Sequence, residues 1–175
     1  MSSEKRKRSS FLLVPLTVFA VVIADQLLKY FSVTHLASRP IVVFPFLSLV
    51  STLNTGAAFS FLAGLATSNT LLIFIALIFI GLLIYYHDHF PADPLSQVFY
   101  ALIMGGALGN LADRLFRAGV VDFISFSFFP AFNLADTALS IGMGGLILLV
   151  LRDEFCVWRK RQKTAKSKKK QKQEG

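Results

Sequence analysis

Four long apolar runs divide the chain, with shorter polar and turn-forming segments between and around them. A helix needs about 20 residues to cross the roughly 30 Å hydrocarbon core of a bilayer, and each run reaches that length. The runs cover residues 11–30, 67–86, 96–115 and 132–151. Hydrophobic residues make up 54% of the chain and charged residues 16%, which also favours a membrane protein. The pattern predicts an all-α membrane protein with four transmembrane helices.

Basic residues gather at the two ends of the chain and set its expected orientation, since Lys and Arg near span ends are retained in the cytoplasm. The chain divides into a basic N-terminus (1–10), a membrane domain (11–152) and a basic tail (153–175). Both termini are therefore expected in the cytoplasm. The net charge of +8 follows from this topology, and the Lys-rich tail is expected to lie against anionic lipid. Nothing else in the sequence points to nucleic acid as a partner.

The first forty residues also fit a secretory signal peptide. A basic start, an apolar stretch and small residues such as Ala20 and Ala24 occur together there. The apolar run, however, continues to Tyr30 and is followed by three more runs. A retained first transmembrane helix is therefore the better interpretation.

The connections between the runs differ in length and composition. Residues 31–66 are rich in β-branched and aromatic residues and turn formers, without a helical stripe. We expect a small β-rich periplasmic segment there, resting on the outer membrane surface and covering the site as a flap. Residues 87–94 form a short cytoplasmic turn. In the third connection, residues 116–131, the alternating FISFSFFP predicts a brief strand at the interface.

Polar residues gather at the predicted outer ends of the spans. Outside the termini and the cytoplasmic turn, the only acidic residues are Asp25, Asp113, Asp122 and Asp136, all within or beside the apolar runs. Ionisable groups are costly in such places and indicate function. Other polar residues expected at the same depth are Lys29, Asn110, Arg114 and Asn133. The sequence therefore predicts a site at the outer end of the spans.

The acidic residues differ in their sequence neighbours. Asp25 and Lys29 are four apart on one helical face, so a structural ion pair explains them. Arg114 is either a clamp for a lipid phosphate or a partner of Asp25. Asp122 and Asp136 have no cation nearby in the sequence, which makes them the candidates for catalysis.

Two carboxylates within hydrogen-bond range cannot both ionise cheaply, so one keeps a proton while the other acts as a base toward water. Such a pair activates water against a carbonyl and later delivers a proton to the leaving amine, and it requires neither metal nor cofactor. The competing sets are weaker. His35, His87 and His89 lack metal-ligand spacing, no serine has a partnered histidine, and the single cysteine, Cys156, follows the last run.

Other motifs have simpler explanations. Gly105 and Gly109 form a GxxxG spacing that favours close helix packing. Asn54 in NTG is either a turn former or an amide that orders a substrate backbone. A proton-coupled carrier would place its carboxylates near the bilayer midplane, often in repeated halves, and neither feature occurs in the sequence. A lipid-binding scaffold would need Arg114 but not Asp122 or Asp136.

Five sequence blocks resemble the lipoprotein signal peptidase family, also called signal peptidase II. They occur in the expected order relative to four spans, and the resemblance covers nearly the whole chain apart from the basic ends. The blocks are DQLLK (25–29), NTGAAF (54–59), GGALGNLADR (105–114), VVDF (120–123) and FNLAD (132–136). In that family the aspartates matching Asp122 and Asp136 form the catalytic dyad. The family's other polar positions, which stabilise the site or contact substrate, match Asp25, Lys29, Asn54, Asn110, Asp113, Arg114 and Asn133.

The resemblance implies an aspartic endopeptidase that cuts diacylglyceryl-modified prolipoproteins just before the lipidated cysteine, at the outer face of the bacterial inner membrane. It also implies contact with membrane lipids and inhibition by the cyclic peptide globomycin. We further expect a monomer with no metal and no cofactor. Two features depart from the family pattern: the stretch from Asp122 to Asp136 is shorter than usual and lacks a Trp, and the Lys-rich tail is an unusual extension.

Overall fold

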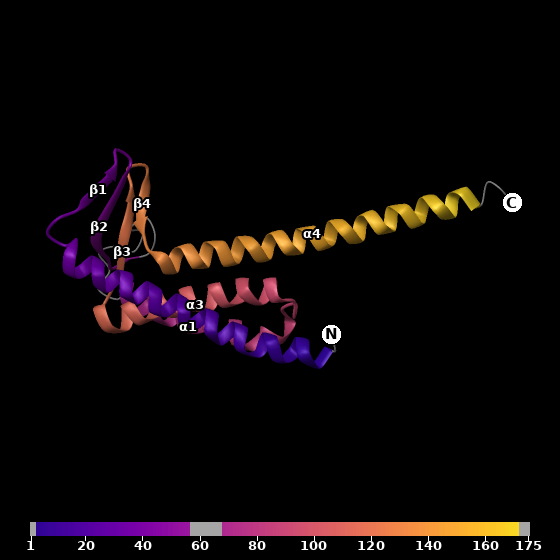
Figure 1. Cartoon of the computed structure of the whole chain (residues 1–175), viewed down its shortest axis with the longest axis horizontal. Coiled ribbons are helices and arrows are strands. Elements are labelled where there is room, and N and C mark those ends of the chain that lie inside the picture. Colours follow the sequence, from indigo (N-terminus) through magenta and orange to yellow (C-terminus); the bar gives the residue numbers. More distant parts are fainter. Residues whose placement is uncertain (1–2, 57–67, 172–175) are drawn as a thin grey trace.

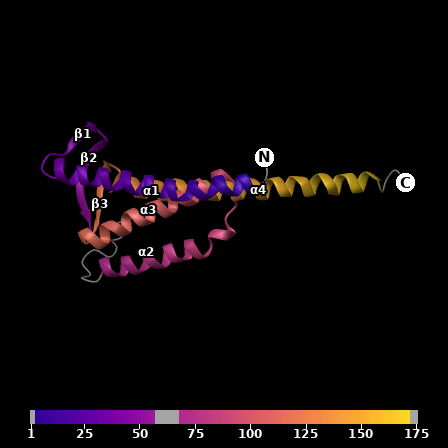
Figure 2. The same cartoon turned by 60° about the horizontal axis from the view of Figure 1, so that its bottom comes forward.

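The computed structural model describes residues 3–56 and 68–171. Its helices run alongside one another, and a small sheet stands at one end of them (Figures 1 and 2). In chain order the elements are α1 (Ser3–His35), β1 (Ile41–Phe44), β2 (Leu47–Asn54), α2 (Ser68–Tyr85), the 3₁₀ helix η2 (His87–His89), α3 (Pro94–Arg117), β3 (Val120–Phe126), β4 (Phe129–Phe132) and α4 (Leu134–Gln171).

Length and apolarity make this a helical membrane protein. Among the described residues, three helical segments are long and apolar enough to cross a membrane: Leu12–His35, Pro94–Arg117 and Leu134–Gln162. The apolar part of α2, Asn69–Tyr85, is shorter. At 1.5 Å per residue it spans about 26 Å, slightly less than a typical hydrocarbon core. The count of four membrane-crossing helices therefore stays a prediction.

The helices extend beyond the predicted spans. α1 begins before residue 11 and continues past residue 30 to His35, and α3 exceeds the predicted 96–115 at both ends. α4 starts at Leu134, because Phe132 belongs to β4, and it continues through the basic tail as far as Gln171. An apolar run marks only the part suited to lipid, whereas Lys, Arg and Gln are good helix formers that let a helix continue into its polar flanks.

α3 lies at the centre of the bundle, and α1, α2 and α4 all pack against it. Glycines allow the close approach. A Cβ at Gly105 would lie 2.8 Å from the Cβ atom of Val21 in α1, and one at Gly109 would lie 2.8 Å from the Oδ2 atom of Asp25 in the same helix. The close packing predicted from the glycine spacing is thus confirmed.

The four strands form one antiparallel sheet in the order β1-β2-β3-β4. The prediction of a sheet in residues 31–66 was therefore incomplete, because its other half comes from the third connection, where the predicted strand is confirmed as β3. β2 pairs with β3 so that Thr52 lies opposite Asp122. Ala118, with a left-handed φ of 57°, follows α3 and helps the chain turn into β3. Residues 57–66 of the predicted flap lie outside the described residues.

Three helix ends meet beside this sheet. The C-terminal parts of α1 and α3 lie next to the start of α4, so that residues far apart in the sequence come together at one end of the bundle (Figure 1). The turn containing η2 and the N-terminus of α1 lie toward the opposite end. All the polar side chains predicted to share one depth belong to the end with the sheet.

Candidate active site

A fully buried lysine on α1 forms ion pairs with two aspartates of the site. The Nζ atom of Lys29 lies 2.8 Å from Oδ2 of Asp25 and 3.0 Å from Oδ2 of Asp113, and none of the three side chains is exposed to solvent. Arg117, four residues after Asp113, forms an ion pair with the other oxygen of that carboxylate. We call these four residues the charge cluster. The ion pair predicted between Asp25 and Lys29 is present.

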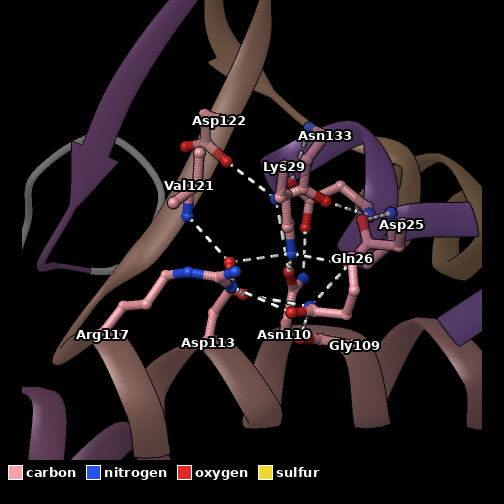
Figure 3. A network of polar contacts seen from close by, with 12 residues as sticks. Asp25, Gln26, Lys29, Gly109, Asn110, Asp113, Arg117, Val121, Asp122 and Asn133 are labelled. Atoms are coloured by element: carbon pink, nitrogen blue, oxygen red, sulfur yellow. Dashed lines mark hydrogen bonds and ion pairs between the residues drawn. The ribbon is translucent and has the colours of Figure 1, made fainter. Parts of the chain in front are cut away.

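Gln26 ties the charge cluster together across α1 and α3 (Figure 3). Its Nε2 donates to Oδ1 of Asp113 at 3.0 Å and to the backbone oxygen of Gly109 at 3.2 Å, and its Oε1 accepts from Arg117 at 2.9 Å. Sequence reasoning missed both Gln26 and Arg117. The spacing of Asp113 and Arg117 was an available signal, whereas a neutral glutamine gave none.

Two asparagines lie between the charge cluster and the remaining carboxylates. Oδ1 of Asn110 accepts from Lys29 at 3.0 Å and from Nδ2 of Asn133 at 3.2 Å. Because an amide has one acceptor and one donor end, these contacts orient Nδ2 of Asn110, which donates to Oδ1 of Asp136 at 2.7 Å. Nδ2 of Asn133 also donates to Oδ1 of Asp122 at 2.8 Å. A chain of amide contacts therefore connects Asp122 with Asp136.

Asp122 and Asp136 are held by neutral groups. Nδ2 of Asn54 donates to the second oxygen of Asp122 at 3.1 Å, and the backbone N–H of Asn133 donates to Oδ2 of Asp136 at 3.3 Å. Within residues 3–56 and 68–171, neither carboxylate forms an ion pair with a Lys or Arg. Asn54 also accepts from the backbone N–H of Gly56 at 3.1 Å, so it shapes its turn and contacts a carboxylate at the same time.

The surroundings of Asp122 favour its protonated form. Burial in β3 is the main cause, the nearby negative charge of Asp136 adds to it, and together they raise the pKa of Asp122 to about 6. The hydrogen bonds from Asn54 and Asn133 oppose the rise, because they stabilise the ionised carboxylate. A pKa near this value suits a group that gives and takes a proton close to neutral pH.

The two aspartates of the charge cluster also hold the backbone beside the other two. Oδ2 of Asp113 accepts from the N–H of Val121 at 2.9 Å, one residue before Asp122. Oδ1 of Asp25 accepts from the N–H of Ala135 at 2.9 Å, one residue before Asp136. The charge cluster therefore fixes where β3 and the start of α4 present their carboxylates.

Arg114 takes no part in the charge cluster. Its guanidinium donates to the backbone oxygen of Asn110 at 3.3 Å, and its own backbone oxygen accepts from Asn69 at 3.1 Å, which links α3 to α2. The alternative in which Arg114 pairs with Asp25 is wrong, since Lys29 occupies that position. Contact with a lipid phosphate stays a prediction. In the described part of the chain, no group of three His, Cys, Asp or Glu side chains is arranged to hold a metal ion.

The fold and the site define a helical membrane protein with two amide-bound carboxylates, the buried Asp122 and the partly buried Asp136, where its helices meet a small sheet. Residues 17–152 match the family model described as signal peptidase (SPase) II. The chain belongs to this signal peptidase II family. It is therefore a membrane protease of lipoprotein processing, and family membership implies that it removes signal peptides from prolipoproteins.

Individual relatives agree with the family match. The lipoprotein signal peptidase of Thermodesulfovibrio yellowstonii is 39% identical over 133 residues, which cover 73% of this chain and 87% of the relative. That of Tolumonas auensis is 41% identical over 141 residues, covering 76% and 85%. A solved structure described as a bacterial membrane enzyme is 36% identical and has a TM-score of 0.72, covering 81% of this chain and 88% of that one.

Proposed function

We propose that the chain is an aspartic endopeptidase in which Asp122 and Asp136 form the catalytic dyad. The observation that carries this proposal is the contrast in partners: the fully buried Asp25 and Asp113 are neutralised by Lys29 and Arg117. Asp122 and Asp136, by contrast, are bound by amides alone. A carboxylate already locked to a cation is a poor base, so the unpaired aspartates are the ones suited to proton transfer.

In the proposed mechanism the dyad shares one proton. The ionised aspartate takes a proton from water as the water oxygen attacks the scissile carbonyl, and the protonated aspartate donates a hydrogen bond to the carbonyl oxygen. When the C–N bond breaks, a dyad proton passes to the leaving amine, and the dyad returns to its singly protonated state. Asn110 and Asn133 keep the carboxylates oriented throughout.

The remaining site residues divide into two groups. The ion pairs of Lys29 with Asp25 and Asp113 stabilise the site, because the two aspartates also hold the backbone next to Asp122 and Asp136. Asn54 is assigned to the peptide backbone of the substrate, and Arg114 to a phosphate of a neighbouring lipid. The proposed substrate is a prolipoprotein whose cysteine carries diacylglycerol, cut on the N-terminal side of that cysteine.

Purified protein tests this proposal directly. We expect cleavage of a diacylglyceryl-modified precursor, no cleavage of the same precursor without lipid, and inhibition by globomycin. Equal cleavage of both precursors would remove the lipid requirement. Cleavage that stops on addition of a metal chelator and resumes with metal would contradict the dyad mechanism.

We also propose a bacterial inner-membrane location with four spans, both termini in the cytoplasm and the site near the periplasmic face. The terminal clustering of basic residues supports this orientation. Alkaline phosphatase fused after Lys172 should be inactive, and the same enzyme inserted near Ser38 should be active. The reverse pattern would place the site on the cytoplasmic side.

The β-rich segment of residues 31–66 is proposed to act as a flap over a monomeric enzyme. Its support is the contact of Asn54 with Asp122, which brings the end of β2 to the dyad. Photo-cross-linkers placed near Asn54 should capture bound precursor or globomycin. Failure to capture either ligand under conditions where both bind would exclude the flap.

A further inference from the structure

Phenylalanine side chains gather at the end of the sheet away from Asp122. Phe44 and Phe46 lie at the turn between β1 and β2, and Phe128 and Phe129 lie at the turn between β3 and β4. We call these four residues the phenylalanine tip. The backbone N–H of Ser127 donates to the oxygen of Phe46 at 3.1 Å, so the two turns are joined to each other.

The tip is an organised aromatic surface. Its side chains are between 50% and 77% exposed, the highest value belonging to Phe128. The rings of Phe44 and Phe46 stack with centroids 5.6 Å apart, and Phe126 lies 6.4 Å from Phe46 and 5.5 Å from Phe128. A single exposed phenylalanine needs no explanation, but a contiguous aromatic patch of this kind marks an interaction surface.

Charge decides what kind of partner suits the tip. Residues 40–54, which contain the β1–β2 hairpin, and residues 123–133, which contain the β3–β4 hairpin from just after Asp122 onward, include no Asp, Glu, Lys or Arg. The surface therefore offers nothing to a charged protein or to a phosphate. The bond between the two turns satisfies one backbone donor and one backbone acceptor of the tip, which lowers the cost of moving it into hydrocarbon.

The tip lies where lipid is expected. The strands cross the direction of the helices and carry the tip to the side of the bundle, at about the level of the helix ends that bear the site and not far beyond them (Figures 1 and 2). At the same end of α1, Tyr30 and Phe31 are exposed on the helix surface. The apolar surface of the helices thus continues sideways into the sheet at the edge of the membrane.

We propose that the phenylalanine tip inserts among the acyl chains of the adjacent leaflet and anchors the sheet to the bilayer. Aromatic rings held rigidly by a hairpin can enter lipid with little loss of conformational freedom. Anchoring at one end of β2 and β3 sets the depth of their other end, which carries Asn54 and Asp122. This lipid contact does not depend on the catalytic roles proposed above.

Tryptophan fluorescence in lipid nanodiscs tests the insertion. The chain has a single tryptophan, so Trp158→Phe provides a silent full-length background. A reporter is placed in the tip by Phe128→Trp, with Phe44→Trp as a second variant should the first fold poorly. Phe19→Trp, at an exposed apolar position of α1, serves as the membrane control, and Asp88→Trp, at a side chain 98% exposed within η2, serves as the water control.

Phosphatidylcholine brominated near the head group or near the chain end serves as the lipid quencher, and iodide as the water quencher. Bromine near the head group should remove roughly half of the tip fluorescence and bromine near the chain end less, while iodide has little effect, as expected for interfacial insertion. Iodide quenching equal to that of Asp88→Trp, without bromine quenching, would overturn the proposal. Shielding from both quenchers would also overturn it, in favour of a contact with a second copy of the chain.

Discussion

Four carboxylates of this protein belong to one hydrogen-bonded network but occupy two different environments within it. In the charge cluster, Asp25 and Asp113 share the fully buried Lys29, and Asp113 also pairs with Arg117. Asp122 and Asp136 are held by asparagine amides and one backbone N–H. The comparison teaches that burial alone does not mark a catalytic acid, because the counter-charge decides which carboxylate can still exchange a proton.

Hydrogen bonds connect the two environments directly. Asp113 binds the N–H that precedes Asp122, and Asp25 binds the N–H that precedes Asp136. Lys29 reaches the second environment through Asn110, whose amide it orients. In the mechanism that we propose, the ion pairs hold the backbone in place, and the neutral amide contacts leave a proton free to move between Asp122 and Asp136. Substitutions that damage one environment at a time can separate these roles.

The largest expected effect follows from removing a dyad carboxylate. Asp136→Asn keeps the size of the side chain but cannot take a proton, so turnover of lipid-modified precursor should fall at least ~10²–10⁴-fold. The double variant Asp122→Asn/Asp136→Asn should be scarcely worse than either single variant, because groups in one proton-transfer unit are not additive. Two independent losses that multiply would show that the residues act separately.

Breaking the charge cluster should act on stability. Lys29→Met leaves Asp25 and Asp113 buried with the loss of their shared cation, a change that typically costs about 3–5 kcal/mol. Chemical unfolding in detergent measures this loss. Adding Asp25→Asn to Lys29→Met removes one stranded charge and should recover part of it. A Lys29→Met protein as stable as the parent would contradict the view that this cluster is the scaffold.

The pKa of Asp122 predicts a dependence on pH. The pKa of Asp122 is raised from its ordinary value of 3.8 to about 6, so the folded protein favours the protonated carboxyl. The protonated carboxyl therefore contributes its full share to the free energy of unfolding below pH 3.8, and this contribution is lost as the pH rises through about 6. Asp122→Asn cannot ionise, and its stability relative to the parent should therefore improve by ~1–3 kcal/mol between pH 4 and pH 7. Thermal unfolding across that range checks the sign, and a pH-independent difference would refute the raised pKa.

A smaller effect is expected at the edge of the charge cluster. Arg117 is partly exposed, and Asp113 keeps Lys29 without it, so Arg117→Gln should cost only about 1 kcal/mol. Gln26→Leu removes neutral hydrogen bonds to the same carboxylate and should cost a similar amount. Unfolding of both variants beside Lys29→Met ranks the three contacts. A loss at Arg117 larger than that at Lys29 would reverse the proposed hierarchy.

The sequence predicted the polar layer because carboxylates beside apolar runs are too costly to occur without a purpose. It also predicted the ion pair of Asp25 and Lys29, which depends only on helical spacing. Contacts between distant segments could not be predicted in the same way. The bond from Asn54 to Asp122 depends on the register of β2 against β3, and that from Ala135 to Asp25 on the rotation of α4 against α1.

The sheet and the helix ends illustrate the same limit. Strand pattern predicted strands in the first and third connections, but their union in one sheet is a long-range pairing that no local pattern specifies. Apolar runs located the helices but not their ends, which continue into polar flanks such as the tail of α4. Gln26 bridges two helices, but a neutral side chain on an apolar helix gives no sequence signal of such a contact.

The most direct test of the account compares matched variants from the two environments in one measurement. Asp122→Asn and Asp25→Asn make the same chemical change, one at an amide-bound carboxylate and one at an ion-paired carboxylate. Turnover of a diacylglyceryl-modified precursor is measured per folded molecule, with the folded fraction taken from thermal unfolding. The account predicts that Asp122→Asn is folded but inactive, and that Asp25→Asn unfolds more easily yet keeps most of its activity per folded molecule. Near-parental turnover by a folded Asp122→Asn protein would contradict it.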